Sequence, residues 1–242
     1  MSAADRSTSN RHLSDRHLVL RNHWRRPLGP LGYYWFLTFE ELPELHSLVN
    51  KCQTLIDFPY YDVTPSESLH LTLDRIAYHD KIPQHQLSSI SSAATHACRD
   101  IEPFDITVDR LSCFRSAIAF NISPAQPVHD LRGTLRSATL SVASNAQIQV
   151  SESNPHITIA YSNSNGIDAT EADTAVTEMN TSIREVNLTV AEAAMVLLER
   201  RQHSYSWEVI SRIPLAGMSR ASRSGTYPPI ARTSASGEES RN

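Results

Sequence analysis

Apolar and polar residues alternate most regularly in two short stretches, Leu-His-Leu-Thr-Leu and, 86 residues later, Pro-His-Ile-Thr-Ile. Alternation over this length predicts a β-strand, and residues two apart in a strand lie on the same face. His70 and Thr72 are therefore expected on one face of the first strand, and His156 and Thr158 on one face of the second. The apolar residues between them anchor the opposite face of each strand in a core.

The rest of the pattern predicts a succession of helices and strands. Apolar residues at helical spacing predict helices at about 43–55, 84–100, 126–143 and 169–181. Alternating runs, or runs rich in aromatic and β-branched residues, predict further strands at 33–39, 58–63, 104–111, 117–122, 148–150, 186–190, 194–199 and 207–213. The strands at 104–111 and 117–122 are expected to be antiparallel neighbours.

An internal duplication is visible in this succession. A histidine strand, a helix, an alternating strand and a further strand occur over residues 69–122 and again over 155–213. Ile-Thr-Val in the first copy corresponds to Leu-Thr-Val in the second. The duplication predicts two lobes, each of which supplies one histidine.

The two ends of the chain lack any such pattern. Residues 1–26 are polar and basic and 217–242 are rich in Ser and Arg, so both are expected to be disordered, apart from one helical turn at 18–24. Arg, Pro and Gly residues at 25–30 predict a linker. The expected organisation is a basic arm, 1–26, one bilobal domain, 27–216, and a tail, 217–242.

An imidazole beside a hydroxyl, presented twice, suits the cleavage of a phosphoester without a metal. One histidine can take a proton from the attacking oxygen while the other gives a proton to the leaving oxygen, because the unperturbed pKa of histidine is about 6.5. The two hydroxyls can donate hydrogen bonds to the non-bridging phosphate oxygens. His-x-Ser/Thr alone is a frequent pattern, found also at His12-Leu13-Ser14. The functional interpretation therefore depends on the presence of two copies of the motif, each in a predicted β-strand.

With the motifs His70-Leu71-Thr72 and His156-Ile157-Thr158, the chain resembles the two-histidine (2H) phosphoesterase superfamily, in its 2′-5′ RNA ligase-like and cyclic phosphodiesterase branch. The resemblance extends over about 31–215 by the order of elements. It implies an α+β fold in which bilobal, duplicated antiparallel sheets with flanking helices surround a central cleft.

The same resemblance implies a metal-independent phosphodiesterase that acts on a 2′,3′-cyclic phosphate or a 2′-5′ phosphodiester of RNA ends or nucleotides, and whose reverse reaction seals a 2′-5′ bond. His70 and His156 would be the acid and the base, in an order that the sequence leaves open. Thr72 and Thr158 would hold the phosphate oxygens. Neither a metal nor another cofactor is expected.

Four further residues are candidates for substrate binding, each with a structural alternative. Tyr161 either stacks on a base or lies in the core, and Phe36 either walls the base pocket or lies in the core. Arg75 either reaches the phosphate, if its strand bends, or forms a surface ion pair. Arg115 either lines the mouth of the cleft or lies in a solvated turn. Strand alternation puts Arg75 and Tyr161 on the face opposite the histidines.

Charge and cysteine content narrow the expected partners. The whole chain carries −4 and its two ends carry +4 and +2, which leaves −10 on residues 27–216. An acidic body argues against binding along a long nucleic acid and favours a small nucleotide or an RNA terminus. The three cysteines have no metal or redox spacing, which is typical of reduced thiols in a cytoplasmic protein. No signal peptide or membrane span is expected, and we expect a monomer.

Two alternatives belong to other functional classes. The cleft could belong to a module that binds a nucleotide or RNA end without significant turnover, although binding alone does not require both a proton donor and a proton acceptor. The chain could also be an interaction protein that acts through its basic ends. Loss of the two ends without loss of activity would exclude the second alternative.

Overall fold

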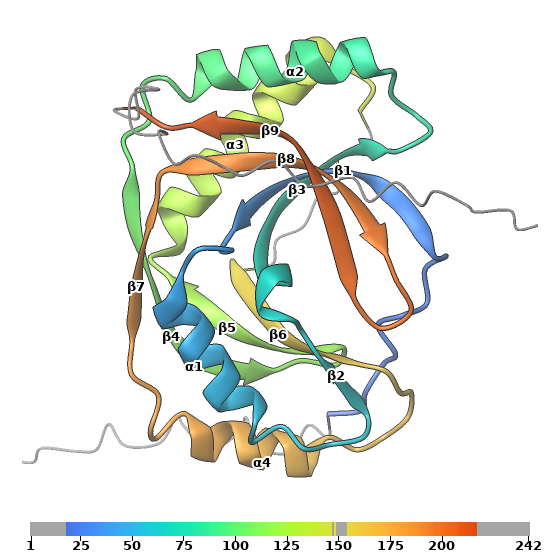
Figure 1. Ribbon diagram of the computed structural model, residues 1–242, viewed down its shortest axis with the longest axis vertical. Coiled ribbons are helices and arrows are strands. Elements are labelled where there is room, and N and C mark those ends of the chain that lie inside the picture. The colour runs from blue at the N-terminus through green and yellow to red at the C-terminus, as the bar shows by residue number, and fades with distance from the viewer. Residues whose placement is uncertain (1–17, 147, 149–153, 217–242) are drawn as a thin grey trace, which may run out of the picture.

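The computed structural model of the chain describes residues 18–146, 148 and 154–216. Two antiparallel sheets form its centre (Figure 1). The upper sheet has the order β3-β1-β8-β9, with β1 (Gly29–Thr38), β3 (His70–Tyr78), β8 (Glu192–Arg200) and β9 (Tyr205–Pro214). The lower sheet has the order β2-β6-β5-β4-β7, with β2 (Tyr61–Val63), β4 (Phe104–Cys113), β5 (Ala117–Ser123), β6 (His156–Ser162) and β7 (Val186–Val190).

The helices cover the outer faces of the two sheets (Figure 1). α2 (Gln84–Ala97) contacts β9 and α3 (Ala125–Val142) contacts β3, so both pack on the upper sheet. α1 (Pro43–Gln53) contacts β6 and α4 (Thr170–Met179) contacts β4 of the lower sheet. Each helix buries an apolar stripe, such as Leu87, Ile90 and Ala94 of α2. The expected α+β architecture of antiparallel sheets with flanking helices is confirmed.

All four predicted helices and the predicted pairing of β4 with β5 are present. β1 differs from prediction because it begins at Gly29, inside the expected linker. A side chain at Gly32 would collide with the carbonyl oxygen of Ala77, so the absence of one lets β1 and β3 approach closely. Of the predicted strand 148–150, Ile148 has no regular structure and the other two residues lie outside the described ones.

The two lobes are not the two sequence copies, which corrects the expectation from the duplication. β4 and β5 follow the His70 strand in the chain but pair in the sheet that contains His156. β8 and β9 follow the His156 strand but complete the sheet that contains His70. Each sheet therefore needs strands from both copies, because β5 is the neighbour of β6 and β8 is the neighbour of β1.

The segment 18–26 is ordered, so the expectation of a disordered arm is wrong for these residues. Leu20 and Trp24 are buried, Val19 forms an isolated β-bridge with Asp168, and no helical turn is present at 18–24. The segment is held because its apolar residues find partners that are remote in sequence. Residues 1–17 and 217–242 lie outside the described residues. Within the described part of the chain, no helix is both long enough and apolar enough to cross a membrane.

Candidate functional site

The two motif histidines have the same local geometry. Each is the first residue of its strand, and each Nδ1 lies 2.9 Å from the carbonyl oxygen two residues earlier, that of Ser68 for His70 and that of Asn154 for His156. A carbonyl oxygen only accepts hydrogen bonds, so both Nδ1 atoms carry hydrogen. Each Nε2 is then the ring nitrogen that remains to give or take a proton. β3 and β6, which carry the two rings, contact each other between the sheets.

The surroundings of the two rings differ. His70 is 9% exposed and lies flat on Phe36, with ring centroids 4.3 Å apart and an interplanar angle of 16°. Trp207 meets the same imidazole edge-on at 5.2 Å. Burial, with a smaller contribution from the charge of His156, lowers the pKa of His70 to about 4. His70 is therefore neutral at pH 7. His156 is only half-buried.

Two β-bulges place Arg75 and Tyr161 differently from the simple alternation. Leu73 in β3 is skipped in the register with β1, and Ile159 in β6 is skipped in the register with β5. One extra residue shifts the following side chains to the other face, so Arg75 and Tyr161 come to the histidine face. Arg75 lines a cavity together with His156, and the Tyr161 hydroxyl forms a hydrogen bond with Thr158. The predicted opposite-face position is wrong for both residues.

A cavity of about 200 Å³ lies along the outer edge of β3 and opens beside the motifs. Thr72 and Arg75 line it from β3, His156 from the start of β6, and His129 and Arg132 from α3. Thr72 is exposed and Thr158 is buried. No sequence pattern singled out His129 or Arg132, because the helix that brings them to β3 lies outside both motifs.

Three of the four secondary candidates take their structural alternative. Phe36 is fully buried beneath His70. Tyr161 is 8% exposed, since His23 stacks on its ring at 4.1 Å, and burial raises its pKa. Neither ring is available to a base. Arg115 lies exposed in the turn between β4 and β5, where its carbonyl oxygen accepts a hydrogen bond from the backbone N–H of Arg21.

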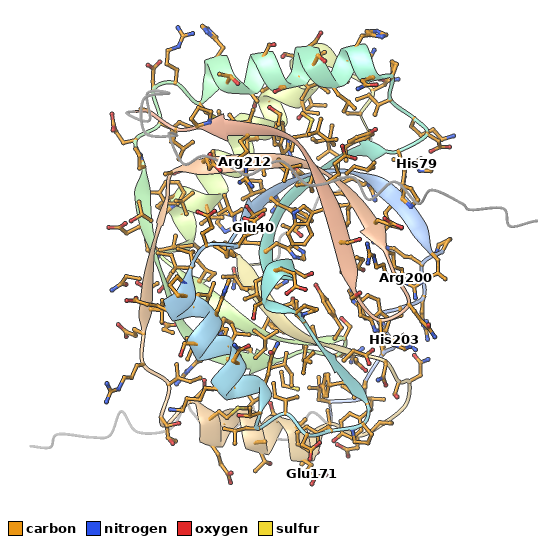
Figure 2. All side chains as sticks on the ribbon, in the orientation of Figure 1. Glu40, His79, Glu171, Arg200, His203 and Arg212 are labelled. Carbon is orange, nitrogen blue, oxygen red and sulfur yellow. The ribbon has the colours of Figure 1, made fainter. Side chains whose placement is uncertain are left out.

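Residues 22–26, called the strap below, contact both sheets and connect them. The indole N–H of Trp24 donates to Asp62 in β2 at 2.7 Å. Arg200 at the end of β8 is buried and donates to the carbonyl oxygens of Trp24 and Arg26. Figure 2 shows Arg200 near the tip of the β8–β9 hairpin, beside His203, and His203 lies 2.8 Å from Asp62.

His23 of the strap packs against Tyr161 and Tyr205. Its Nε2 hydrogen-bonds the Tyr205 hydroxyl at 2.8 Å. Burial lowers its pKa to about 4, and the charges of Arg26, Arg200 and His70 contribute. The sequence alone indicated no chemistry for His23, because nothing in a basic, unpatterned arm pointed to packing except the neighbouring tryptophan.

Phe114 is a further residue that the motifs did not indicate. It is 42% exposed and its ring centroid lies 6.0 Å from that of His156. An exposed aromatic ring beside His156 can serve as a stacking surface for a base. Among the described residues, no three His, Cys, Asp or Glu side chains come together as a metal-binding group.

Comparisons with known proteins agree with this geometry. A family described as the 2′-5′ RNA ligase superfamily matches residues 42–202. The crystal structure of TT0787 of Thermus thermophilus is similar, with a TM-score of 0.59 at 16% identity over 77% of this chain and 99% of that one. No curated protein sequence matches the chain.

Two other solved structures have a similar fold. Escherichia coli LigT in its apo form has a TM-score of 0.55 at 15% identity, covering 78% of this chain and 99% of that one. A protein of unknown function from Agrobacterium tumefaciens has a TM-score of 0.54 at 14% identity, covering 83% and 92%. LigT has also been crystallised with 3′-AMP, ATP and NADP⁺. At these identities the structural likenesses establish the fold.

Proposed function

Because the chain belongs to the 2′-5′ RNA ligase superfamily, among the two-histidine phosphoesterases, we propose that it cleaves a 2′,3′-cyclic phosphate or a 2′-5′ phosphodiester of a nucleotide or RNA end without a metal. The observation that carries the proposal is the matched geometry of His70 and His156. In both, a backbone carbonyl fixes the hydrogen on Nδ1 and leaves Nε2 for proton transfer.

The different burial of the two rings supports an assignment of roles. His70 stays neutral at pH 7, since its pKa is lowered to about 4, and therefore serves as the base. Its Nε2 takes a proton from the attacking water as the water oxygen bonds to phosphorus. The opposite P–O bond breaks, and the ribose oxygen that leaves takes a proton from His156. When a ribose 5′-hydroxyl replaces water as the nucleophile on a 2′,3′-cyclic phosphate, the same proton transfers join its oxygen to phosphorus, release the 3′ oxygen and form a 2′-5′ bond.

The remaining groups stabilise the charge that gathers on the phosphate. The Thr72 hydroxyl is exposed at the cavity, and Thr158 occupies the equivalent position after His156. Arg75 lines the same cavity and adds a positive charge beside Thr72. Positively charged and hydrogen-bonding groups aimed at developing oxyanion charge are the usual source of such stabilisation. The nucleotide complexes of LigT support a nucleotide as the substrate class.

The direct test is turnover by chelator-treated protein of adenosine 2′,3′-cyclic phosphate and of a 2′-5′-linked dinucleotide. We expect hydrolysis of at least one, unchanged by chelator, and an isomer of the product that identifies the leaving oxygen. Strict dependence on added metal would contradict the mechanism. Binding of 3′-AMP by folded protein without turnover of either substrate would favour the alternative of a binding module.

A further inference from the structure

We infer that the cavity beside Thr72 and His156 holds a second phosphate of the substrate, the one on the ribose 5′ oxygen, through Arg132 and His129. The inference rests on the proposed function, because it assigns a neighbouring subsite for the same substrate. It specifies the substrate class as a 5′-phosphorylated nucleotide or an RNA terminus, in preference to a nucleoside cyclic phosphate that lacks the 5′ group.

The position of the cavity makes it continuous with the reacting groups. Thr72 and His156 form part of its lining, and Arg132 and His129 form another part. Its volume of about 200 Å³ is far above the roughly 15 Å³ that one water needs. A ligand that has one phosphate at the motifs can therefore extend into the same cavity toward α3.

Arg132 brings a buried positive charge that the protein itself leaves partly unmatched. Its side chain is 14% exposed, and among the described residues its Nε has no hydrogen-bond partner. The nearest carboxylate is Asp74, whose Oδ2 lies 3.9 Å from that Nε. The same oxygen accepts a hydrogen bond from Arg136 at 2.7 Å, while Oδ1 accepts the backbone N–H of Arg75.

A largely buried guanidinium with a long, shared ion pair and an unused N–H is costly, and an added acceptor would lower that cost. With Asp74 already bonded to Arg136, no carboxylate of the described residues is left for Arg132 alone, and a bound anion would supply the missing acceptor. A guanidinium pairs well with a phosphate, since its planar donors match the spacing of phosphate oxygens. His129 lies three residues before Arg132 and so on the same side of α3, where it can add a further hydrogen bond.

The border of the cavity also suits an anionic ligand. β3 is the outermost strand of the upper sheet, and an outermost strand has main-chain groups without a strand partner on one side. Leu71, Leu73 and Asp74 of β3 line the cavity, with Val128 of α3. Among the described residues of this lining, Asp74 is the one acidic side chain, and its charge is engaged by Arg136. Arg132 therefore adds a positive charge to the lining that the engaged Asp74 does not fully balance.

The kinetic test compares adenosine 2′,3′-cyclic phosphate with its 5′-phosphorylated form. We expect wild-type kcat/KM to favour the 5′-phosphorylated form by about 10- to 100-fold, as the loss of hydrogen bonds to a charged group implies. Arg132→Met should abolish this preference, and His129→Gln, at a half-buried position, should reduce it. Arg99→Met is the control, because it removes one positive charge at an exposed position outside the cavity lining and should keep the preference.

A binding measurement separates this inference from the proposed function. Calorimetric titration with adenosine 3′,5′-bisphosphate and with 3′-AMP needs no turnover. We expect Arg132→Met and His129→Gln to weaken binding of the bisphosphate and leave that of 3′-AMP unchanged. If this holds while no cyclic phosphate is hydrolysed, the subsite stands and the proposed activity fails. Equal binding of the two ligands by wild type, or equal weakening in the variants, overturns the subsite even if hydrolysis is observed.

Discussion

At the scale of single residues, His70 and His156 share one hydrogen-bonding arrangement and differ in exposure. The shared arrangement is local, since each histidine is the first residue of its strand and its Nδ1 hydrogen is accepted by the carbonyl oxygen two residues earlier. The difference follows from long-range packing. Phe36 and Trp207 cover His70, and these residues come from β1 and β9, which no local reading of the motif could bring together.

The burial of His70 should be visible in the pH dependence of kcat/KM. The base must be deprotonated, so kcat/KM should rise with pH through the pKa of His70. Because that pKa is lowered to about 4, the acid limb of the pH profile is expected below pH ~5.5. A histidine with the ordinary pKa of about 6.5 would give a limb at higher pH. Trp207→Ala uncovers the imidazole and should move the limb toward that ordinary value. A wild-type limb already at the ordinary value, or one that Trp207→Ala leaves unmoved in folded protein, would contradict the assignment of His70 as the base.

The two motif threonines should separate catalysis from stability. Thr72 is exposed, so Thr72→Val should lower kcat/KM by about 100-fold, the usual effect of removing one oxyanion donor, while the melting temperature stays unchanged. Thr158 is buried and hydrogen-bonded with Tyr161. Thr158→Val should lower both quantities. The measurements are kcat/KM and the melting temperature of the two variants. An unchanged kcat/KM in Thr72→Val would exclude the Thr72 hydroxyl from the site.

At the scale of elements, the sequence located most of the regular structure but not its irregularities. The predicted helices and the motif strands are present, because periodicity reports which face of each element is buried. The bulges at Leu73 and Ile159 leave no such signal, and they decide which face Arg75 and Tyr161 occupy. The strap was missed for a related reason. Trp24 is buried by residues from β2, β6 and β9 that are remote in sequence.

Arg200 should carry much of the attachment of the strap. Its buried guanidinium donates to two strap carbonyls, so Arg200→Met should lower the free energy of unfolding by about 2 kcal/mol or more. Arg201→Met is the control, since Arg201 is exposed and should change stability by about 0.5 kcal/mol at most. Urea unfolding of both variants tests this, and equal stability of the two would refute the role of Arg200.

At the scale of the whole molecule, strands of the two sequence copies are exchanged between the two sheets. Because β5 completes the sheet of His156 and β8 completes the sheet of His70, neither sequence copy can build its own lobe. The duplication was readable in the sequence and so was the family, since both depend on local motifs. The placement of β5 and β8 in the sheet of the other copy was not readable. The apolar face of a strand is buried whether the strand pairs within its own copy or with the other one.

The most direct test of the central claim is a double-mutant cycle on kcat/KM with metal-free enzyme and the better of the two substrates. His70→Asn and His156→Asn should each lower kcat/KM by about 100- to 10,000-fold, the range for general acid–base catalysis. Because the two rings act in one transition state, the double variant should be no slower than the worse single variant. Losses that multiply, or a single variant that keeps wild-type activity, would contradict a shared two-histidine mechanism.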